Sequence, residues 1–310
     1  MILCADIGGT KSLLGLARDG QLLADRRYAN ADFPDFAGVL AAFFADTQTD
    51  PALVTGGCLA VAGPIADDGR KAALTNLPWS IDSEALSRRF GLPALRLAND
   101  FAAAAAGAIT ASATQRLTLQ EGEAQDDAPR LVVGAGTGLG MAIALPQDGG
   151  TWKILAGEGG HVAFAPADAQ QMALWAFLHE RHGRVTWERV VSGPGLAAIH
   201  RFVAGIELAP EEITTRALAD ANSAERRSLG LFLAAYGAFA GDMALACLAR
   251  GGVFLAGGIA ARVLPLLLHG DFLKAFNAKA GHAAIAARMP VHVALDPLLG
   301  VRGAMLLARE

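Results

Sequence analysis

The chain has 310 residues, of which 53% are apolar and 18% charged, so it can bury the cores of two domains of ordinary size. Its net charge of −4 gives no basic excess, and we expect no nucleic-acid partner. The longest apolar stretches, residues 101–113 and 230–241, are too short to span a bilayer, and no signal peptide precedes the first predicted strand. Cys4, Cys58 and Cys247 lie far apart and indicate free thiols. We therefore expect a cytoplasmic protein with no membrane association.

The first 110 residues predict a small α/β domain, because short apolar strands alternate with segments of helical spacing. The expected elements are a three-strand meander over 1–28, a helix over 35–47, a strand over 53–61, a helix opened by Ile81, a strand over 94–97 and an alanine-rich helix over 101–109. Asp82 or Ser83 can cap the helix that Ile81 opens, because either side chain can accept a backbone N–H bond.

Residues 111–297 predict a second, larger α/β domain. Its expected elements are strands over 131–133, 141–145, 252–255 and 291–295, and helices over 169–182, 193–204, 213–220, 223–250 and from 258 through 269. A polar segment, residues 120–129, precedes its first strand. We expect a C-terminal helix within residues 298–310 to pack back onto the first domain.

Two glycine-rich loops occupy matching positions near the starts of the two domains. The first, Asp6-Ile7-Gly8-Gly9-Thr10, and the second, residues 134–140, each follow a buried strand and lead into a second apolar run. Each second run meets an Asp-Gly pair, Asp19-Gly20 or Asp148-Gly149, of the kind that closes a hairpin. Free backbone N–H groups and a threonine hydroxyl could hold a polyphosphate from both sides. The alternative is two ordinary hairpin turns.

Neither loop matches two common nucleotide-binding motifs. The first is not a P-loop, because no glycine precedes Lys11 and no helix follows. The second is not a dinucleotide fingerprint, because Leu139 or Met141 stands where the third glycine belongs. Asp6 places a carboxylate where Mg²⁺ could bridge phosphates, through water since Mg²⁺ keeps several waters. Ala256-Gly257-Gly258 follows another strand, and its small residues would let a base or ribose approach the backbone.

Asn99-Asp100 ends a predicted strand and opens a predicted helix. One interpretation is helix capping alone, because Asn and Asp are preferred N-caps. The other is that Asp100 acts as a base. A helix N-terminus favours the ionised carboxylate, which could accept a hydroxyl proton during attack on a γ-phosphate.

Glu158-Gly159-Gly160-His161 and Glu188 are further candidates for binding an acceptor. Two glycines between a carboxylate and an imidazole suit a tight loop that presents both side chains. The alternatives are a structural role for His161 and a solvated helix charge at Glu188. Together with Asn99 and Asp100, these side chains could bond a ring of hydroxyl groups and discriminate against analogues that lack one.

Taken together, the motifs resemble those of the bacterial ATP-dependent glucokinases, within the sugar kinase, heat-shock protein and actin superfamily. The matching segments are Asp6-Ile7-Gly8-Gly9-Thr10, Leu74-Thr75-Asn76 with Trp79, Leu97-Ala98-Asn99-Asp100-Phe101, residues 134–140, Glu158-Gly159-Gly160-His161-Val162, Glu188-Arg189 with Ser192-Gly193-Pro194-Gly195-Leu196, and Ala256-Gly257-Gly258-Ile259. They run through nearly the whole chain.

The resemblance implies a two-domain actin-like ATPase (ribonuclease H-like) fold with a cleft that closes on D-glucose, and commonly a homodimer. It implies a phosphotransferase that uses ATP and Mg²⁺, with Asp100 as general base for the sugar 6-hydroxyl and Asp6 beside the metal. The implied sugar-binding residues are Asn99, Asp100, Glu158, His161 and Glu188. The implied nucleotide-binding residues are Ala5, Asp6, Ile7, Gly8, Gly9, Thr10, Gly136, Thr137, Gly138, Gly257 and Gly258.

The chain departs from the family pattern at two positions. Lys11 stands where these glucokinases usually have Asn, and a Lys at this position is more like the related repressor/kinase family. Ala163 replaces an acidic residue that is common after the Glu-Gly-Gly-His segment. The chain lacks that second family's cysteine-rich zinc motif and its N-terminal helix-turn-helix. The alternatives to a glucokinase are a kinase for another hexose or an N-acetylhexosamine, a non-catalytic sugar sensor, and a polyphosphate-dependent kinase.

Overall fold

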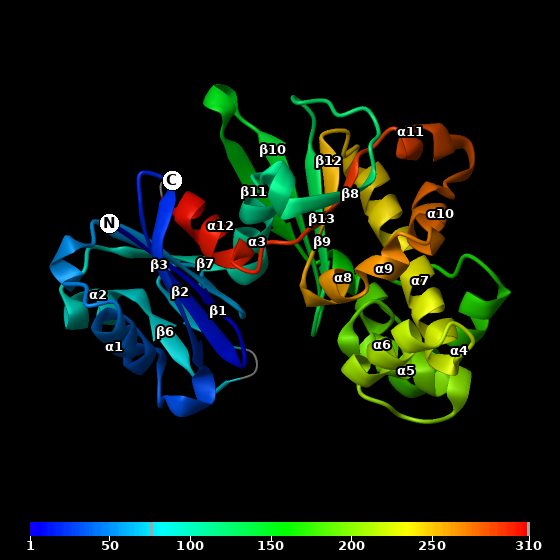
Figure 1. The fold of residues 1–310 in the computed structure, drawn as a ribbon, viewed down its shortest axis with the longest axis horizontal. Helices are drawn as coiled ribbons and strands as arrows, with labels where there is room; N and C mark the ends of the chain where they lie inside the picture. Colours follow the sequence, from blue (N-terminus) through cyan, green and yellow to red (C-terminus); the bar gives the residue numbers. More distant parts are fainter. Residues whose placement is uncertain (75–76, 309–310) are drawn as a thin grey trace. The chain divides into compact units, whose positions relative to one another are not determined.

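The structure, a computed structural model, describes residues 1–74 and 77–308. Thr75 and Asn76, which belong to one of the matching motifs, lie outside the described residues, as do Arg309 and Glu310 at the end of the expected terminal helix. The chain divides into two compact units, of which one comprises Met1–Ala111 with Asp296–Glu310 and the other Ser112–Leu295 (Figure 1).

The first unit is built on a five-stranded sheet of order β3-β2-β1-β4-β7. Strand β1 pairs antiparallel with β2 and parallel with β4, and β4 pairs parallel with β7. Asp19 and Gly20 join β2 to β3 with φ angles of 52° and 83°, the left-handed pair that a tight hairpin needs, so the expected meander is confirmed. The strands are β1 Ile2–Ile7, β2 Lys11–Arg18, β3 Gln21–Ala29, β4 Gly56–Val61 and β7 Leu95–Asn99.

Four helices complete the described part of the first unit, and side-chain caps set where three of them, α1, α2 and α3, begin. Asp35 caps α1, and Asp82 rather than Ser83 caps α2. Ile81 lies not in the helix but in β6, one strand of a short hairpin that the sequence analysis did not predict. The helices are α1 Phe36–Asp46, α2 Ser83–Phe90, α3 Asp100–Ile109 and α12 Leu299–Leu307, and the hairpin strands are β5 Lys71–Ala73 and β6 Ser80–Asp82.

Helices α3 and α12 cross at very short range. A Cβ built on Gly107 of α3 would overlap the Leu299 carbonyl, and one built on Gly303 of α12 would overlap the Ala103 carbonyl. The red helix α12 accordingly lies beside α3 in Figure 1. The alanine run of α3 therefore has a packing role, because small side chains let the two backbones touch.

The second unit contains a six-stranded sheet of order β11-β10-β9-β12-β13-β8. Strands β9, β12 and β13 are parallel, and the other pairs are antiparallel. The edge strand β8 was not predicted, although Leu117 and Leu119 alternate with polar residues as a strand requires. The strands are β8 Arg116–Gln120, β9 Arg130–Ala135, β10 Leu139–Pro146, β11 Trp152–Gly157, β12 Gly252–Ala256 and β13 Val291–Ala294.

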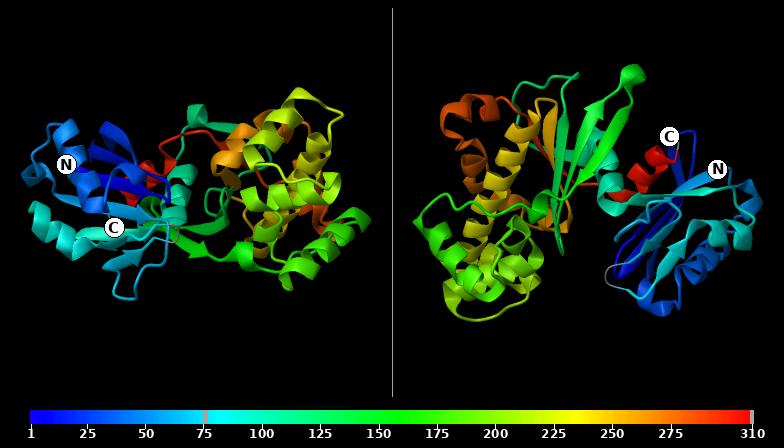
Figure 2. Two further views of the ribbon diagram at one scale, coloured as in Figure 1. Left: turned by 90° about the horizontal axis from the view of Figure 1, so that it is seen from below. Right: turned by 180° about the vertical axis from the view of Figure 1, so that it is seen from behind.

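Helices of the second unit carry most of its apolar core. Among the described residues, α7 is the one helix long and apolar enough to cross a membrane, but two-thirds of its most apolar window is buried inside the unit. Tyr236 and Phe239 of α7 are fully buried, so α7 is a core helix. In Figure 2 the green and yellow helices of residues 169–247 lie together. The long helices are α4 Ala169–His182, α5 Gly193–Ala204, α6 Pro210–Ala219 and α7 Ala224–Cys247.

The helix expected from residue 258 through 269 is wrong as a single element. The chain leaves helical geometry at Val263, and Pro265, which lacks an N–H donor, lies in the first turn of a new helix. The short helices are α8 Gly258–Arg262, α9 Leu264–Leu267, α10 Asp271–Asn277 and α11 Ala283–Ala287. The 3₁₀ helices are η1 Asn30–Asp32, η2 Pro51–Leu53, η3 Ala113–Gln115, η4 Asp148–Gly150, η5 Gly159–His161, η6 Trp187–Arg189 and η7 Ala280–His282.

Candidate active site

In the first unit, candidate residues meet at one edge of the sheet. Asp6 lies near the carboxyl end of β1, and Asn99 ends β7. The register aligns Ile7 with Val61 and Val61 with Asn99, so the ends of β1 and β7 are level across β4. Strands two positions apart are separated by roughly 10 Å. The carboxyl edge of parallel strands is where open α/β sheets bind ligands.

Asp6 is the most perturbed carboxyl of this edge. Burial raises its pKa to about 6, the negative charge of Asp100 adds to the rise, and the positive charge of Lys11 opposes it. A Cβ built on Gly300 would overlap Asp6 Oδ2, so the carboxyl group lies directly against the first turn of α12. Of the first-unit candidates, Asp6 is therefore the carboxyl group that a bound cation would stabilise most in its ionised form.

Of the two residues, Asn99 caps the helix, whereas Asp100 lies in its first turn. Asn99 is the N-cap of α3, because its Oδ1 accepts the Phe101 and Ala102 N–H groups at 3.0 and 3.1 Å. Asp100 begins the helix, and its Oδ1 accepts the Phe101 N–H at 2.8 Å. Burial raises the pKa of Asp100, so the expected preference of the helix N-terminus for the ionised form is outweighed by desolvation.

The first glycine loop is fixed by Asn30, a buried residue that the sequence analysis missed. The Asn30 Nδ2 donates to the Gly8 carbonyl at 2.8 Å, and its backbone N–H donates to the Thr10 carbonyl at 3.0 Å. The Gly8 N–H donates to the Lys11 carbonyl at 3.0 Å. Among the described residues, no hydrogen bond uses the N–H of Gly9 or Thr10. Two donors are thus left to a ligand in a rigid loop, as a phosphate cradle requires.

In the second unit, the other two glycine loops lie side by side. Gly134 of β9 pairs with Ala256 of β12, so both loops leave the same sheet edge. Gly257, with a φ of 87°, approaches so closely that a Cβ would lie 2.7 Å from the Ala135 carbonyl. Gly258, in contrast, faces open space. The two loops could therefore contact neighbouring parts of one ligand.

Two further hydrogen bonds hold the loop of Gly136, Thr137 and Gly138. The Gly193 N–H donates to the Gly136 carbonyl at 2.7 Å, and the Leu139 N–H donates to Glu188 Oε2 at 2.9 Å. In the part of the chain that the structure describes, the N–H groups of Thr137 and Gly138 donate no hydrogen bond. They are available to bind an anion.

The acceptor candidates of this unit lie on segments that pack against β10 and the loop that precedes it. Gly159 and Gly160 allow η5 to lie against β10, because a Cβ on either would overlap Met141 or Leu139. His161 Nε2 lies 3.7 Å from Glu158 Oε2, and both side chains are largely exposed. The Trp187 N–H donates to the Val162 carbonyl at 3.0 Å and joins η6 to η5. Glu188 thus contacts Leu139 directly, and the η5 turn that carries His161, with Glu158 just before it, packs against the same strand.

A family comparison agrees with this arrangement. Residues 3–310 match the model of the Glucokinase family. The chain belongs to the glucokinase family. The resemblance that the sequence motifs indicated is therefore confirmed.

Several glucokinases resemble this chain over its whole length. A curated glucokinase of Nostoc sp. is 35% identical over 99% of this chain and 98% of its own. The crystal structure of a glucokinase from an Antarctic psychrotroph has a TM-score of 0.87 and 29% identity, over 99% of this chain and 98% of that one. A ROK family glucokinase from Streptomyces griseus, solved with glucose and AMPPNP, has a TM-score of 0.67 and 21% identity, over 99% of both chains. The expected α/β, actin-like ATPase fold class is confirmed.

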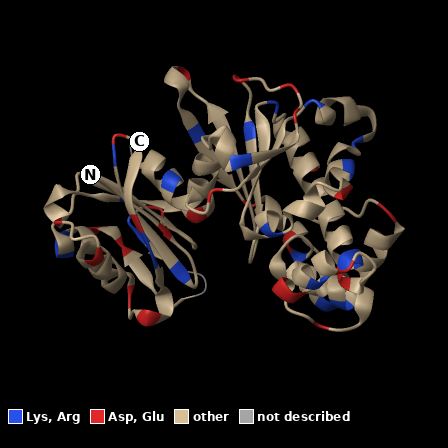
Figure 3. Ribbon diagram, viewed as in Figure 1, with Lys and Arg blue, Asp and Glu red and all other residues tan. Residues whose placement is uncertain are grey.

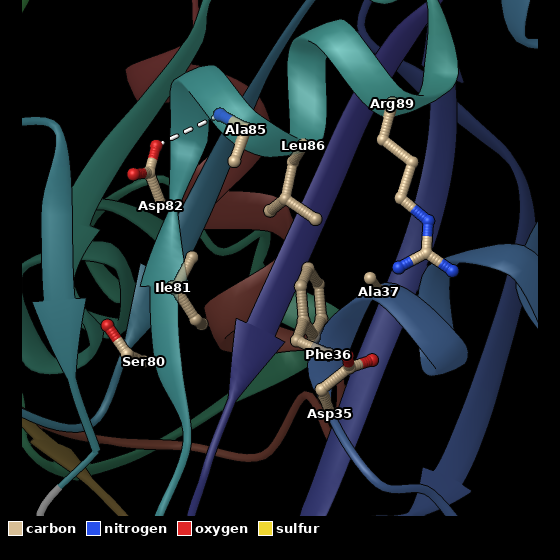
Figure 4. Close-up of a pocket in the computed structure, with 9 residues that line it drawn as sticks. All are labelled: Asp35, Phe36, Ala37, Ser80, Ile81, Asp82, Ala85, Leu86 and Arg89. Carbon is tan, nitrogen blue, oxygen red and sulfur yellow. Dashed lines mark hydrogen bonds between the residues drawn. The ribbon is translucent and has the colours of Figure 1, made fainter.

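A cavity in the first unit of this glucokinase family member is lined by none of the candidate residues. Figure 4 shows this cavity of about 200 Å³, and Asp82 is bonded to the Ala85 N–H at 2.9 Å. Asp35, on its other side, caps α1 at Gly38. Its carboxylates thus already serve as helix caps. Its lining is Asp35, Phe36, Ala37, Ser80, Ile81, Asp82, Ala85, Leu86 and Arg89.

Sequence reasoning missed three residues that shape the candidate site. Gly300 supports Asp6, Asn30 fixes the first loop, and Gly193 bonds the second. The signal for Gly193 was present, because Ser192-Gly193-Pro194-Gly195 is one of the motifs that match the family, although no role was assigned to Gly193; Ser192 caps α5. The other two act through contacts between segments distant in sequence.

Acidic and basic residues are interspersed over the described parts of both units (Figure 3).

Proposed function

We propose that this member of the glucokinase family transfers the γ-phosphoryl group of ATP to the 6-hydroxyl of D-glucose. One observation carries the proposal: a loop with unused N–H donors lies directly against Glu188, in a chain that matches the Glucokinase family over residues 3–310. ATP as donor is supported by the AMPPNP held by a structure of the same fold.

Asp100 is proposed as the base for the acceptor. Its Oδ1 is engaged by the Phe101 N–H, which leaves Oδ2 to accept the proton of the sugar 6-hydroxyl. The hydroxyl oxygen then forms a bond to the γ-phosphorus while the bond to the β,γ-bridging oxygen breaks and ADP leaves. The raised pKa of Asp100 makes it a stronger base than an ordinary aspartate, provided that it is ionised.

The donor would be held by the three glycine loops, with Asp6 beside the phosphates. The N–H groups of Gly9, Thr10, Thr137 and Gly138 are the phosphate ligands we assign. The open backbone at Gly258 would admit the base or ribose.

Asp6 fits a role beside Mg²⁺. Among the described residues, no group of three or more His, Cys, Asp or Glu could hold a metal ion. A nucleotide-bound Mg²⁺ takes most of its ligands from phosphates and water, so one carboxylate suffices. When bound, the ion would neutralise charge on the β- and γ-phosphate oxygens. Asp6 would hold it through water.

Sugar hydroxyls would bond to the remaining candidates. The Oδ1 of Asn99 is used in capping, so its Nδ2 is the group we assign to the sugar. Glu158 and His161 are exposed and able to reach a ligand. A site that bonds each hydroxyl rejects sugars in which one is missing or inverted.

The test is a coupled assay of ADP release with a panel of sugars. Glucose should give the highest kcat/KM, and Asp100→Ala should lower kcat by at least about a hundredfold, because a general base contributes at least that much. A higher kcat/KM for mannose or N-acetylglucosamine than for glucose would show that glucose is not the preferred substrate. Absence of sugar-dependent ADP release in a folded preparation would refute the kinase assignment and favour a non-catalytic sugar sensor. Wild-type turnover by Asp100→Ala would refute the base assignment.

The two units, in our proposal, are the functional domains of a cytoplasmic homodimer. The family resemblance supports this assembly. Sedimentation equilibrium should give twice the mass of the 31.9 kDa chain. A single species at the mass of one chain would exclude the homodimer.

A further inference from the structure

Glu188, one of the proposed sugar-binding residues, directly contacts the proposed phosphate loop. Its Oε2 accepts the Leu139 N–H at 2.9 Å, and a Cβ on Gly138 would lie 2.7 Å from the same oxygen. The carboxylate therefore lies against the end of the loop whose Thr137 and Gly138 N–H groups are unused.

The segment that carries Glu188 holds both ends of this loop. Glu188 bonds the Leu139 end, and Gly193, five residues later, bonds the Gly136 end at 2.7 Å. Ser192 fixes the segment itself, because its Oγ donates to the Glu188 carbonyl at 2.7 Å and accepts the Gly195 N–H at 3.0 Å. A displacement of Glu188 is thus transmitted to the loop by direct contact.

A carboxylate can accept hydrogen bonds at both oxygens. Oε2 is occupied by the Leu139 N–H, and the half-buried side chain leaves Oε1 for a sugar hydroxyl. One side chain can therefore bind the acceptor and position the donor loop simultaneously.

We propose that Glu188 is a positioning residue that couples sugar binding to nucleotide binding. Sugar held at Oε1 restricts the carboxylate, and the carboxylate in turn restricts Leu139 and the preceding Thr137 and Gly138 N–H groups. The loop is then ordered before the nucleotide arrives, so less conformational freedom is lost on binding. This inference rests on the proposed role of Glu188 in sugar binding.

Linkage makes the coupling measurable, because the factor by which glucose tightens nucleotide binding equals the factor by which nucleotide tightens glucose binding. Titration calorimetry with AMPPNP and Mg²⁺, with and without saturating glucose, gives this factor. We expect a value of about five or more for the wild type, in the usual range for coupled sites.

Three variants separate the coupling from ordinary contact loss. Glu188→Gln and Glu188→Ala both remove the charge, but only the amide retains an oxygen to accept the Leu139 N–H. Without sugar, Glu188→Gln should bind AMPPNP about fivefold more tightly than Glu188→Ala, the effect expected for one hydrogen bond. Glu158→Ala, which leaves the loop contact intact, is the matched control. It should weaken glucose binding while retaining the wild-type coupling factor at saturating glucose.

A coupling factor near one in Glu188→Ala, with retention in Glu188→Gln and Glu158→Ala, is the expected pattern. Equal AMPPNP affinities of Glu188→Gln and Glu188→Ala would overturn the proposal, as would a wild-type coupling factor of one. Those results would leave phosphorylation of glucose intact. A wild type that does not bind glucose at all would instead refute the proposed function.

Discussion

Replacing Asp6 by Asn should raise the free energy of unfolding and lower the kinase activity. Burial and the charge of Asp100 raise the Asp6 pKa from 3.8 to about 6. At about 1.4 kcal/mol per pKa unit, the ionised carboxylate costs the folded state about 3 kcal/mol at pH 7.5. The folded state binds this proton more tightly than the unfolded chain does. The stability present below pH 3.8 is therefore lost as the pH rises through about 6.

The assay is urea unfolding of the nucleotide-free protein at several pH values. Asp6→Asn should exceed the wild type by about 3 kcal/mol at pH 7.5, by about half of that at pH 5, and by almost nothing below pH 4. Asp19→Asn is the control, because Asp19 is exposed in a left-handed turn that Asn also adopts, and its effect should stay within about 0.5 kcal/mol. Equal or lower stability of Asp6→Asn at pH 7.5 would refute the reasoning.

Two further predictions concern glycines that touch candidate side chains. Gly300→Ala should push Asp6 away from α12 and raise the KM for MgATP at least about tenfold with little change in the glucose KM, measured in the coupled assay; an equal rise in both would count against a local effect. Gly138→Ala should displace Glu188 and raise both KM values, whereas Gly136→Ala, whose Cβ meets open space, should raise the nucleotide KM alone. Identical profiles for the last two variants would show that the contact with Glu188 is unimportant.

Features encoded in a few neighbouring residues could be predicted from the sequence. Both strand–loop–strand units were recognised because an apolar run, a glycine loop and an Asp-Gly pair follow one another within about twenty residues. Helices over 169–182 and 193–204 were placed correctly from their helical pattern. In the structure Asp168 and Ser192 cap these helices, a local signal that agrees with that placement. The candidate residues were likewise found from local motifs.

Features that depend on distant segments could not be predicted. Gly300 meets Asp6, and Asn30 meets Gly8, only because the chain folds back on itself. The pKa of Asp100 was misjudged for the same reason, since the helix N-terminus is visible in the sequence but the burial of its first residue is not. The Glu188 contact with Leu139 also required the structure, because 49 residues separate the two.

The close crossing of α3 and α12 makes the end of the chain part of its chemistry. Asp100 begins α3, and Gly300, which supports Asp6, lies in the first turn of α12. With backbone against backbone at Gly107 and Gly303, no side chain is available to absorb a change in spacing. Deletion from residue 298 onward would thus strip the support from Asp6 and uncover α3 although no assigned ligand is removed. A truncation that removes α12 would therefore impair the protein.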